Sequence, residues 1–266
     1  IRRQWGAKTA ALYMIMVSLT PAMMKISVNN RMYSWTVFGV TVCGLTAYFL
    51  RERLNSKALW TILFLTTFCG IFSAENAQQG LSLLKGREGE KIAADCVTLM
   101  DDPLLEGGFD SAPFDGEGVA SKTKAVVENG VLETLLHNRK TAKKAGCRTT
   151  GNAAGAGRVA PTNLFFRPGK LTQEELLANL GDGLYLTEVS GLHAGANPIS
   201  GDFSLLSRGF EVKGGRVVRA VEEFTVAGNF YQLLKDITDV GGDLLFEASP
   251  IGSPSVLVKR LDVAGA

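Results

Sequence analysis

The stretch Lys124-Ala-Val-Val-Glu-Asn-Gly-Val-Leu-Glu-Thr-Leu-Leu136 contains two β-prone runs that meet at Asn129-Gly130. Asparagine and glycine tolerate the positive φ that a type I′ turn needs at both central positions, so this stretch predicts a β-hairpin. A second hairpin is predicted where Phe210-Glu-Val-Lys-Gly-Gly-Arg-Val-Val218 repeats the pattern around Gly214-Gly215. Two hairpins indicate an antiparallel sheet in this part of the chain.

Helices are predicted between these strands. Residues 77–84 follow Ser73, whose hydroxyl can cap a helix N-terminus. Residues 171–180 begin with the Thr-x-x-Glu spacing of a capping box, and residues 229–237 form another apolar helical pattern. Because strands and helices do not alternate regularly, the predicted fold class is α+β, a twisted antiparallel sheet with flanking helices.

The charge of the chain is divided unevenly. Residues 1–72 hold eight of the 28 basic residues and one of the 26 acidic residues, a net charge of +7. Residues 73–266 then hold 20 basic and 25 acidic residues, a net charge of −5. A negative domain offers no basic footprint to a phosphate backbone, which argues against direct nucleic-acid binding.

The first part of the chain has the composition of a membrane segment. Uncharged stretches cover residues 9–24, 32–50 and 58–74, and the second is long enough to span a bilayer. Lys and Arg lie between the stretches and aromatic residues lie near their ends, as is typical of a membrane hairpin. If two spans end at Leu50, the following basic residues lie on the cytoplasmic side.

Two other interpretations of this segment remain open. One is a secretory signal peptide, although no small-residue cleavage site follows. The other is a fusion or a translation artefact, because the composition changes abruptly near residue 72. The predicted division is therefore an apolar, basic helical segment at residues 1–67 and a folded domain at residues 68–266.

Cysteines and histidines are sparse. Cys43, Cys69, Cys96 and Cys147 include no Cys-x-x-Cys pair, so they are interpreted as reduced, buried apolar side chains of a cytosolic protein. His137 and His193 are the only histidines and lie 56 positions apart. A zinc peptidase needs two ligands on one helical face, so this chain alone cannot build the usual zinc site.

Two polar segments resemble functional motifs only in part. The glycine-rich residues 151–157 lack the preceding strand and following Lys-Ser/Thr of a phosphate-binding loop, and are interpreted as a mobile or substrate-facing loop. Acidic residues at Asp101-Asp102 and between Asp110 and Glu117 lack calcium-loop spacing. They are interpreted as solvated carboxylates in turns beside prolines.

The most function-like segment is Gly191-Leu-His-Ala-Gly-Ala-Asn-Pro-Ile-Ser-Gly-Asp-Phe-Ser204. Glycine-rich loops often present polar groups to ligands. The candidate residues here are His193, Asn197, Ser200 and Asp202. A histidine in such a loop also commonly serves the structure, and Ser-His-Asp chemistry needs a geometry that spacing cannot supply.

Residues 188–204 resemble the signature loop of the PmbA/TldE branch of the TldD/PmbA family, also called modulator of DNA gyrase. The resemblance covers about residues 68–266. Further matching segments occur in the family's order: Phe72-Ser-Ala-Glu-Asn-Ala-Gln-Gln-Gly-Leu-Ser-Leu-Leu-Lys-Gly86, Asp101-Asp-Pro, Pro113-Phe-Asp-Gly-Glu-Gly118, Thr150-Gly-Asn-Ala, Asn163-Leu and Ala227-Gly-Asn-Phe230.

The resemblance implies a soluble, cytoplasmic bacterial or archaeal protein that forms a heterodimer with a TldD-type subunit. Such pairs are zinc metallopeptidases that cleave unfolded or small peptides. TldD carries a His-Glu-x-x-x-His helix and a later cysteine as zinc ligands, whereas residues 58–72 here contain no histidine and residues 240–242 are Val-Gly-Gly. The resemblance therefore implies a non-catalytic subunit without catalytic residues, metal or cofactor, with zinc in its partner.

Under this resemblance the four candidate residues of the 191–204 loop line a peptide cleft. The resemblance implies that the apolar segment occupies the place of the amino-terminal α/β half that is typical of the family. An alternative is thus a membrane-tethered binding or scaffold protein, in which residues 1–57 anchor an inactive family domain. A third interpretation is an independent hydrolase with Cys147 or Ser200 as nucleophile.

Overall fold

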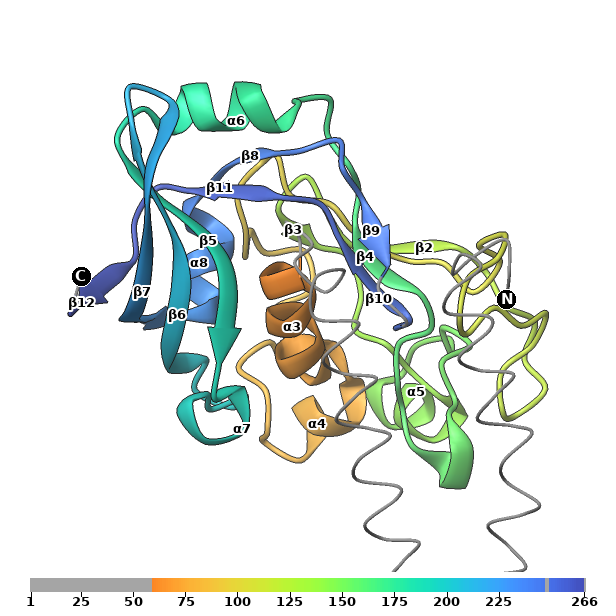
Figure 1. Cartoon of the computed structure of the whole chain (residues 1–266). Helices are drawn as coiled ribbons and strands as arrows, with labels where there is room; N and C mark the ends of the chain where they lie inside the picture. The colour runs from red at the N-terminus through yellow and green to blue at the C-terminus, as the bar shows by residue number, and fades with distance from the viewer. Residues whose placement is uncertain (1–58, 247–248, 266) are drawn as a thin grey trace, which may run out of the picture. The chain divides into compact units, whose positions relative to one another are not determined.

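The computed structural model describes residues 59–246 and 249–265, with elements labelled as in Figure 1. These residues belong to a compact unit that begins at Asn55. The membrane hairpin predicted within residues 1–57, and its alternatives, lie outside the described residues. In the part that is described, no helix combines the length and apolar character needed to cross a bilayer.

The described strands form three sheets. The six-stranded sheet has the order β3-β2-β1-β4-β10-β9, and the four-stranded sheet has the order β12-β7-β6-β5, while β8 and β11 pair with each other. Neighbouring strands are antiparallel except β4 and β10. The bounds are β1 Leu99–Asp101, β2 Lys124–Glu128, β3 Val131–Leu132, β4 Leu164–Phe166, β5 Gly183–Ser190, β6 Asp202–Lys213, β7 Arg216–Asn229, β8 Ile237–Val240, β9 Leu245–Phe246, β10 Ile251–Ser253, β11 Val256–Val258 and β12 Asp262–Ala264.

The described α-helices are short and lie around and between these sheets (Figure 1). Their bounds are α3 Leu59–Phe68, α4 Ala74–Gln78, α5 Arg139–Ala145, α6 Gln173–Leu180, α7 Leu192–Gly195 and α8 Phe230–Asp236. The predicted α+β class, with antiparallel sheets and flanking helices, is confirmed.

Both predicted hairpins are present. Asn129 and Gly130 have φ of 48° and 80°, and they join β2 to β3. A Cβ at Gly130 would overlap the Ala93 carbonyl oxygen, so this position needs glycine for space as well as for conformation. Gly214 and Gly215 have φ of 54° and 75° and join β6 to β7.

The helix predictions are confirmed in two places and wrong in one. Thr172 and Glu175 form the reciprocal capping box of α6, and the Asn229 side chain accepts from the first amides of α8. The helix predicted over residues 77–84 is instead α4, which ends at Gln78. Gly80 follows with φ of 78°, which ends the helix, and the Ser73 side chain makes no capping hydrogen bond.

The core is built around α3, which lies between the four-stranded and six-stranded sheets (Figure 1). The Phe68 ring stacks on Phe230 of α8 at 4.4 Å between centroids, and Phe64 meets Phe203 of β6 edge-on at 4.8 Å. Burying each such side chain contributes about 1.5–3 kcal/mol. One continuous cluster therefore fixes both sheets, and with them the polar segments at their ends.

Candidate functional site

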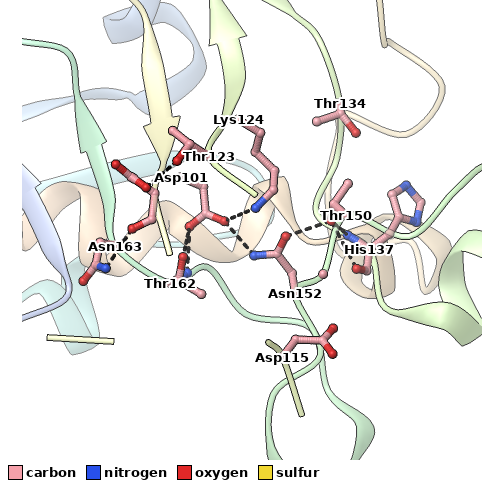
Figure 2. A network of polar contacts seen from close by, with 12 residues as sticks. Asp101, Asp115, Thr123, Lys124, Thr134, His137, Thr150, Asn152, Thr162 and Asn163 are labelled. Atoms are coloured by element: carbon pink, nitrogen blue, oxygen red, sulfur yellow. Dashed lines mark hydrogen bonds and ion pairs between the residues drawn. The ribbon is translucent and has the colours of Figure 1, made fainter. Parts of the chain in front are cut away.

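A buried carboxylate organises the polar residues at the end of β1 (Figure 2). Asp101 is fully buried, and its Oδ2 accepts from Lys124 Nζ at 2.9 Å and from Asn152 Nδ2 at 2.7 Å. Its Oδ1 accepts from the backbone amide of Thr162 at 2.7 Å and from the Thr162 hydroxyl at 2.9 Å. We refer to Asp101, Lys124, Asn152 and Thr162 as the Asp101 cluster.

Strand register places these two charges together. Side chains alternate along β1, so Leu99 and Asp101 face the interior while Met100 is half-buried on the other side. Lys124 of β2 lies directly opposite Asp101 in the antiparallel pair, which brings the ammonium to the carboxylate. The interpretation of Asp101 as a solvated turn residue is therefore wrong.

For Asp102 and Asp115 the turn-forming part of that interpretation is confirmed, although both residues are half-buried. Asp102 Oδ1 accepts from the Leu104 amide at 3.0 Å. Asp115 Oδ1 accepts from the amides of Glu117 and Val119, both at 2.9 Å, and its Oδ2 accepts from Ala153 N at 3.0 Å. The oxygens of these carboxylates are therefore engaged by amides of neighbouring turns and of the following loop.

The glycine-rich segment starts inside the same polar network. Asn152 and Ala153 are buried, so the interpretation of residues 151–157 as a substrate-facing loop is wrong at this end. Asn152 Oδ1 lies 2.8 Å from the Thr150 hydroxyl, which accepts from the His137 amide at 2.6 Å. This chain of contacts connects the Asp101 cluster to His137 (Figure 2).

His137 is buried at the N-terminal side of α5. Desolvation lowers the pKa of its imidazole, and the nearby Glu88 charge and a hydrogen bond with Thr141 oppose this shift. A buried neutral histidine of this kind is a structural group unless a reagent can reach it.

Three of the four predicted cleft residues lie together. Asn197 Oδ1 accepts from the amides of Ile199 and Ser200 at 3.0 and 3.3 Å, which closes the turn after α7. Asn229 Nδ2 donates to the Ser200 carbonyl oxygen and to Asp202 Oδ1, both at 2.8 Å. The hydrogen bond from Asn229, followed by that from Ser200, lowers the pKa of Asp202. We refer to Asn197, Ser200, Asp202 and Asn229 as the Asn229 cluster.

His193 lies apart from these contacts. It is exposed on α7, and among the described residues its ring makes no hydrogen bond to Ser200 or Asp202. A Ser-His-Asp arrangement is thus not assembled in this part of the chain, because a triad requires the histidine to contact both partners.

A groove of about 300 Å³ lies beside α6, β5 and β11. Its lining is mostly apolar, with Leu176, Leu180, Leu184, Val256 and Leu261 as examples. The groove lies at the start of β5, whereas the 191–204 loop follows its end, so the predicted loop residues do not line it.

The described cysteines differ from one another. Burial raises the pKa of the Cys69 thiol to about 11. Cys96 and Cys147 are exposed, so the interpretation of these two as buried apolar side chains is wrong. Cys43 lies outside the described residues.

The described residues do not fit a zinc ion. Within residues 59–246 and 249–265, no three His, Cys, Asp or Glu side chains group as metal ligands. The two histidines lie on separate elements, one before α5 and one on α7. Zinc sites in proteins use three or four such ligands.

The sequence did not indicate that Asp101 contacts Lys124 and Asn152. It also did not indicate that Asn229 contacts Asp202. A usable signal was the alternation along β1, which places Asp101 on the same face as the apolar Leu99. The segments with family resemblance contain Asp101, Asn152 and Asn229, and the fold brings distant segments into contact. Asp101 contacts Asn152 across 51 positions, and Asn229 contacts Asp202 across 27.

Comparisons with known proteins agree with this picture. Residues 55–265 match a family model described as the PmbA/TldA metallopeptidase C-terminal domain. A metalloprotease of Methanothermobacter thermautotrophicus is 32% identical over 241 residues, which cover 85% of this chain and 50% of that protein. Metalloprotease PmbA of Escherichia coli O157:H7 is 34% identical over 179 residues, 66% of this chain and 38% of that protein.

Two solved structures share the fold. A Thermotoga maritima protein described as a modulator of a DNA gyrase has a TM-score of 0.73 and 46% identity, over 76% of this chain and 47% of that one. TldE of Thermococcus kodakarensis has a TM-score of 0.66 and 26% identity, over 73% and 46%. The chain spans about half the length of the curated relatives it matches. The chain belongs to the PmbA/TldD metallopeptidase family, and residues 55–265 match the C-terminal domain of that family.

Proposed function

We propose that this chain acts as the non-catalytic, PmbA/TldE-type subunit of a heterodimeric zinc metallopeptidase that cleaves unfolded or small peptides. The observation that carries the proposal is the separation of its two histidines, one buried beside the Asp101 cluster and one exposed on α7. Zinc and the group that activates water would then come from a TldD-type partner. The Asp101 cluster would stabilise the domain and take no part in the reaction.

In this proposal the Asn229 cluster and His193 shape one end of a peptide cleft. Among the described strands, β5 lies at the edge of its sheet and pairs with β6 alone. An extended peptide can add to such an edge through main-chain hydrogen bonds. A peptide along β5 would run from the apolar groove to the 191–204 loop, where Asn197, Ser200 and Asp202 would contact it.

The test is peptide hydrolysis by the full-length chain, alone and mixed with a TldD-type protein, with and without a zinc chelator. We expect hydrolysis above the partner's own rate only in the mixture, and its loss with chelator. Chelator-resistant hydrolysis by this chain alone would contradict the proposal and favour a nucleophile such as Cys147 or Ser200. No activity in any sample would favour the scaffold interpretation.

A further inference from the structure

Cys147 and His137 form a thiol–imidazole pair at the end of α5. Cys147 Sγ lies 3.8 Å from His137 Nε2, within hydrogen-bond range for sulfur. The imidazole is buried whereas Cys147 is exposed. The pair therefore has a proton acceptor on its inner side and an open face for a reagent, and the proposed function uses neither side chain.

Thr141 contacts the imidazole through Nδ1, whereas the thiol contacts Nε2. The Thr141 hydroxyl oxygen lies 3.2 Å from His137 Nδ1 and also accepts from the Asn138 amide at 3.1 Å. The hydroxyl proton has the Asn138 carbonyl oxygen as an acceptor at 3.3 Å, and in that arrangement Nδ1–H donates to Thr141. In the neutral ring Nε2 is then unprotonated, and its lone pair faces the Cys147 thiol.

The backbone fixes the thiol in this position. Gly146 has φ of 70° and ends α5, and the Cys147 amide donates to the Ala142 carbonyl oxygen at 3.0 Å. This is the hydrogen-bond pattern of a Schellman motif, which orders the residue after the glycine. Cys147 thus occupies an ordered turn, which keeps its thiol next to the imidazole.

The charged residues next to Cys147 along the chain are basic, while the Glu88 carboxylate acts on His137. Exposed cationic side chains on α5 and beside the cysteine are Arg139, Lys140, Lys143, Lys144 and Arg148. Reactive cysteines occur in accessible, electropositive surroundings. Cys96 is also an exposed residue, but its thiol is partly buried and donates to the Ile237 carbonyl oxygen at 3.6 Å. This partial burial, followed by the charges of Asp239 and Asp95, raises the pKa of the Cys96 thiol.

From this geometry we propose that Cys147 is a site of S-thiolation by small anionic disulfides, with His137 as the proton acceptor. Sγ attacks one sulfur of the disulfide, the reagent's S–S bond breaks, and the electron pair leaves with the other sulfur. The thiol proton passes to His137 Nε2 and then to the departing thiolate. The products are a mixed disulfide on Cys147, whose sulfur is oxidised, and one free thiol, whose sulfur is reduced.

The test uses the full-length chain incubated with glutathione disulfide, with adducts on Cys147 and Cys96 followed by peptide mapping and mass spectrometry. We expect Cys147 to be modified at least about tenfold faster than Cys96. With cystamine, a cationic disulfide, the ratio of the two rates should fall. Equal rates at both cysteines with glutathione disulfide would overturn the proposal.

Two variants test the role of His137 as the base separately from the role of the nearby positive charge. His137→Gln should slow modification of Cys147 about tenfold, while Cys96 in the same molecule keeps its rate. Exchanging the exposed Lys143 and Lys144 for glutamine should slow the reaction with glutathione disulfide and not with cystamine. If His137→Gln does not fold, the proposal is still tested by the ratio of Cys147 to Cys96 modification in the wild type and by the lysine variant. An unchanged Cys147 rate in folded His137→Gln would also overturn the proposal.

Discussion

The carboxylate of Asp101 has no contact with water and depends on its protein partners. Asp101→Asn removes the charge that compensates Lys124, whose side chain is only 14% exposed. Loss of one partner of a buried ion pair costs about 3–5 kcal/mol, because the other charge stays buried and unpaired. We expect the free energy of unfolding, measured by urea denaturation, to fall by about this amount.

The control for this prediction is Asp95→Asn. Asp95 pairs with Lys91 at 2.7 Å, but its side chain is 82% exposed. Exposed ion pairs contribute about 0–1 kcal/mol, so this variant should unfold close to the wild-type urea concentration. Similar small effects for both variants would show that the Asp101 cluster does not stabilise the domain.

The burial of His137 predicts that the free energy of unfolding depends on pH. Desolvation lowers its pKa in the folded protein, while the unfolded chain titrates near about 6.5. Between these two pKa values the unfolded chain binds a proton that the folded protein does not. The free energy of unfolding is then highest above about pH 6.5 and falls on acidification, by at most about 1.4 kcal/mol per pH unit.

The measurement is a series of urea unfolding curves between neutral and mildly acidic pH. His137→Gln should reduce the pH dependence, because no imidazole is then buried at this place. His193→Gln, which removes an exposed imidazole on α7, is the matched control. An equal pH dependence in the wild type and His137→Gln would mean that other groups cause it.

The Asp101 cluster shows why single residues were difficult to assign from the sequence. The carboxylate was interpreted as a turn residue because Pro103 follows closely, and that reasoning holds for its neighbour Asp102. Its partners Lys124 and Asn152 lie 23 and 51 positions away. Only the register of β1 and β2 and the path of the following loop bring them together, and one sequence contains no direct signal of either.

The turn between β6 and β7 leads to a prediction about the stability of a glycine variant. Gly215 has positive φ, and a Cβ there would lie 2.9 Å from the Ala178 Cα of α6. Gly215→Ala should therefore destabilise the domain by about 1–3 kcal/mol, through backbone strain and displacement of α6. The measurement is the thermal unfolding midpoint together with the urea midpoint.

Gly214→Asn is the matched control in the same turn. A Cβ at Gly214 meets nothing within 4 Å, and asparagine tolerates positive φ at the first position of a type I′ turn. This variant should keep the wild-type midpoint. A loss of stability equal to that of Gly215→Ala would mean that the turn itself, and not its contact with α6, is responsible.

Asn229 joins the start of α8 to the 191–204 loop, and one substitution separates these two roles. Asn229→Asp keeps an oxygen for the amides of Tyr231 and Gln232, so α8 stays capped. It loses both donors, and it places a second carboxylate beside Asp202. We expect the pKa of Asp202 to rise, measured by an NMR titration.

If the proposed function holds, Asn229→Asp should also lower partner-dependent peptide hydrolysis more than it lowers stability. Gln232→Glu is a suitable control, because Gln232 is exposed on α8 and its side chain bonds to Asp236 of the same helix. If Asn229→Asp hydrolyses peptide at the wild-type rate although the pKa of Asp202 is raised, the 191–204 loop lies outside the peptide cleft.

The elements that could be predicted from sequence are those that depend on neighbouring residues. Both type I′ turns and the capping box of α6 are local, so their residues were sufficient. The helix predicted over residues 77–84 is cut short because Gly80 has a positive φ, so the leucines that follow lie outside the helix. Leu84 is buried, whereas Leu81 and Leu83 are exposed, and the Ser82 hydroxyl bonds to the Ile71 carbonyl oxygen at 2.6 Å.

The pairing of distant strands could not be predicted in this way. Strand β4 pairs in parallel with β10, although the paired residues Leu164 and Ile251 lie 87 positions apart along the chain. The hydrophobic pattern of such short strands does not specify a partner, since many apolar tripeptides could take either place. The six-stranded sheet is therefore a property of the whole core, which α3 completes from one side.

The role of α3 in the core leads to a prediction about where the folding unit starts. Phe64, Leu65 and Phe68 are each at most 4% exposed, and the 3₁₀ turn after α3 adds Ile71 and Phe72 to the same cluster. Each of these side chains contributes about 1.5–3 kcal/mol by burial, and their combined contribution is comparable with the net stability of about 5–15 kcal/mol that is typical of a domain. A protein that begins at Asn55 should unfold in one cooperative urea transition, whereas a protein that begins at Ser73 should show none. Phe68→Ala in the longer protein should lower the free energy of unfolding by about 3–5 kcal/mol, because the ring that stacks on Phe230 is lost from a closed core. A cooperative transition in the protein that begins at Ser73 would show that the two sheets pack without α3, and the core would then have to be assigned to the sheets alone.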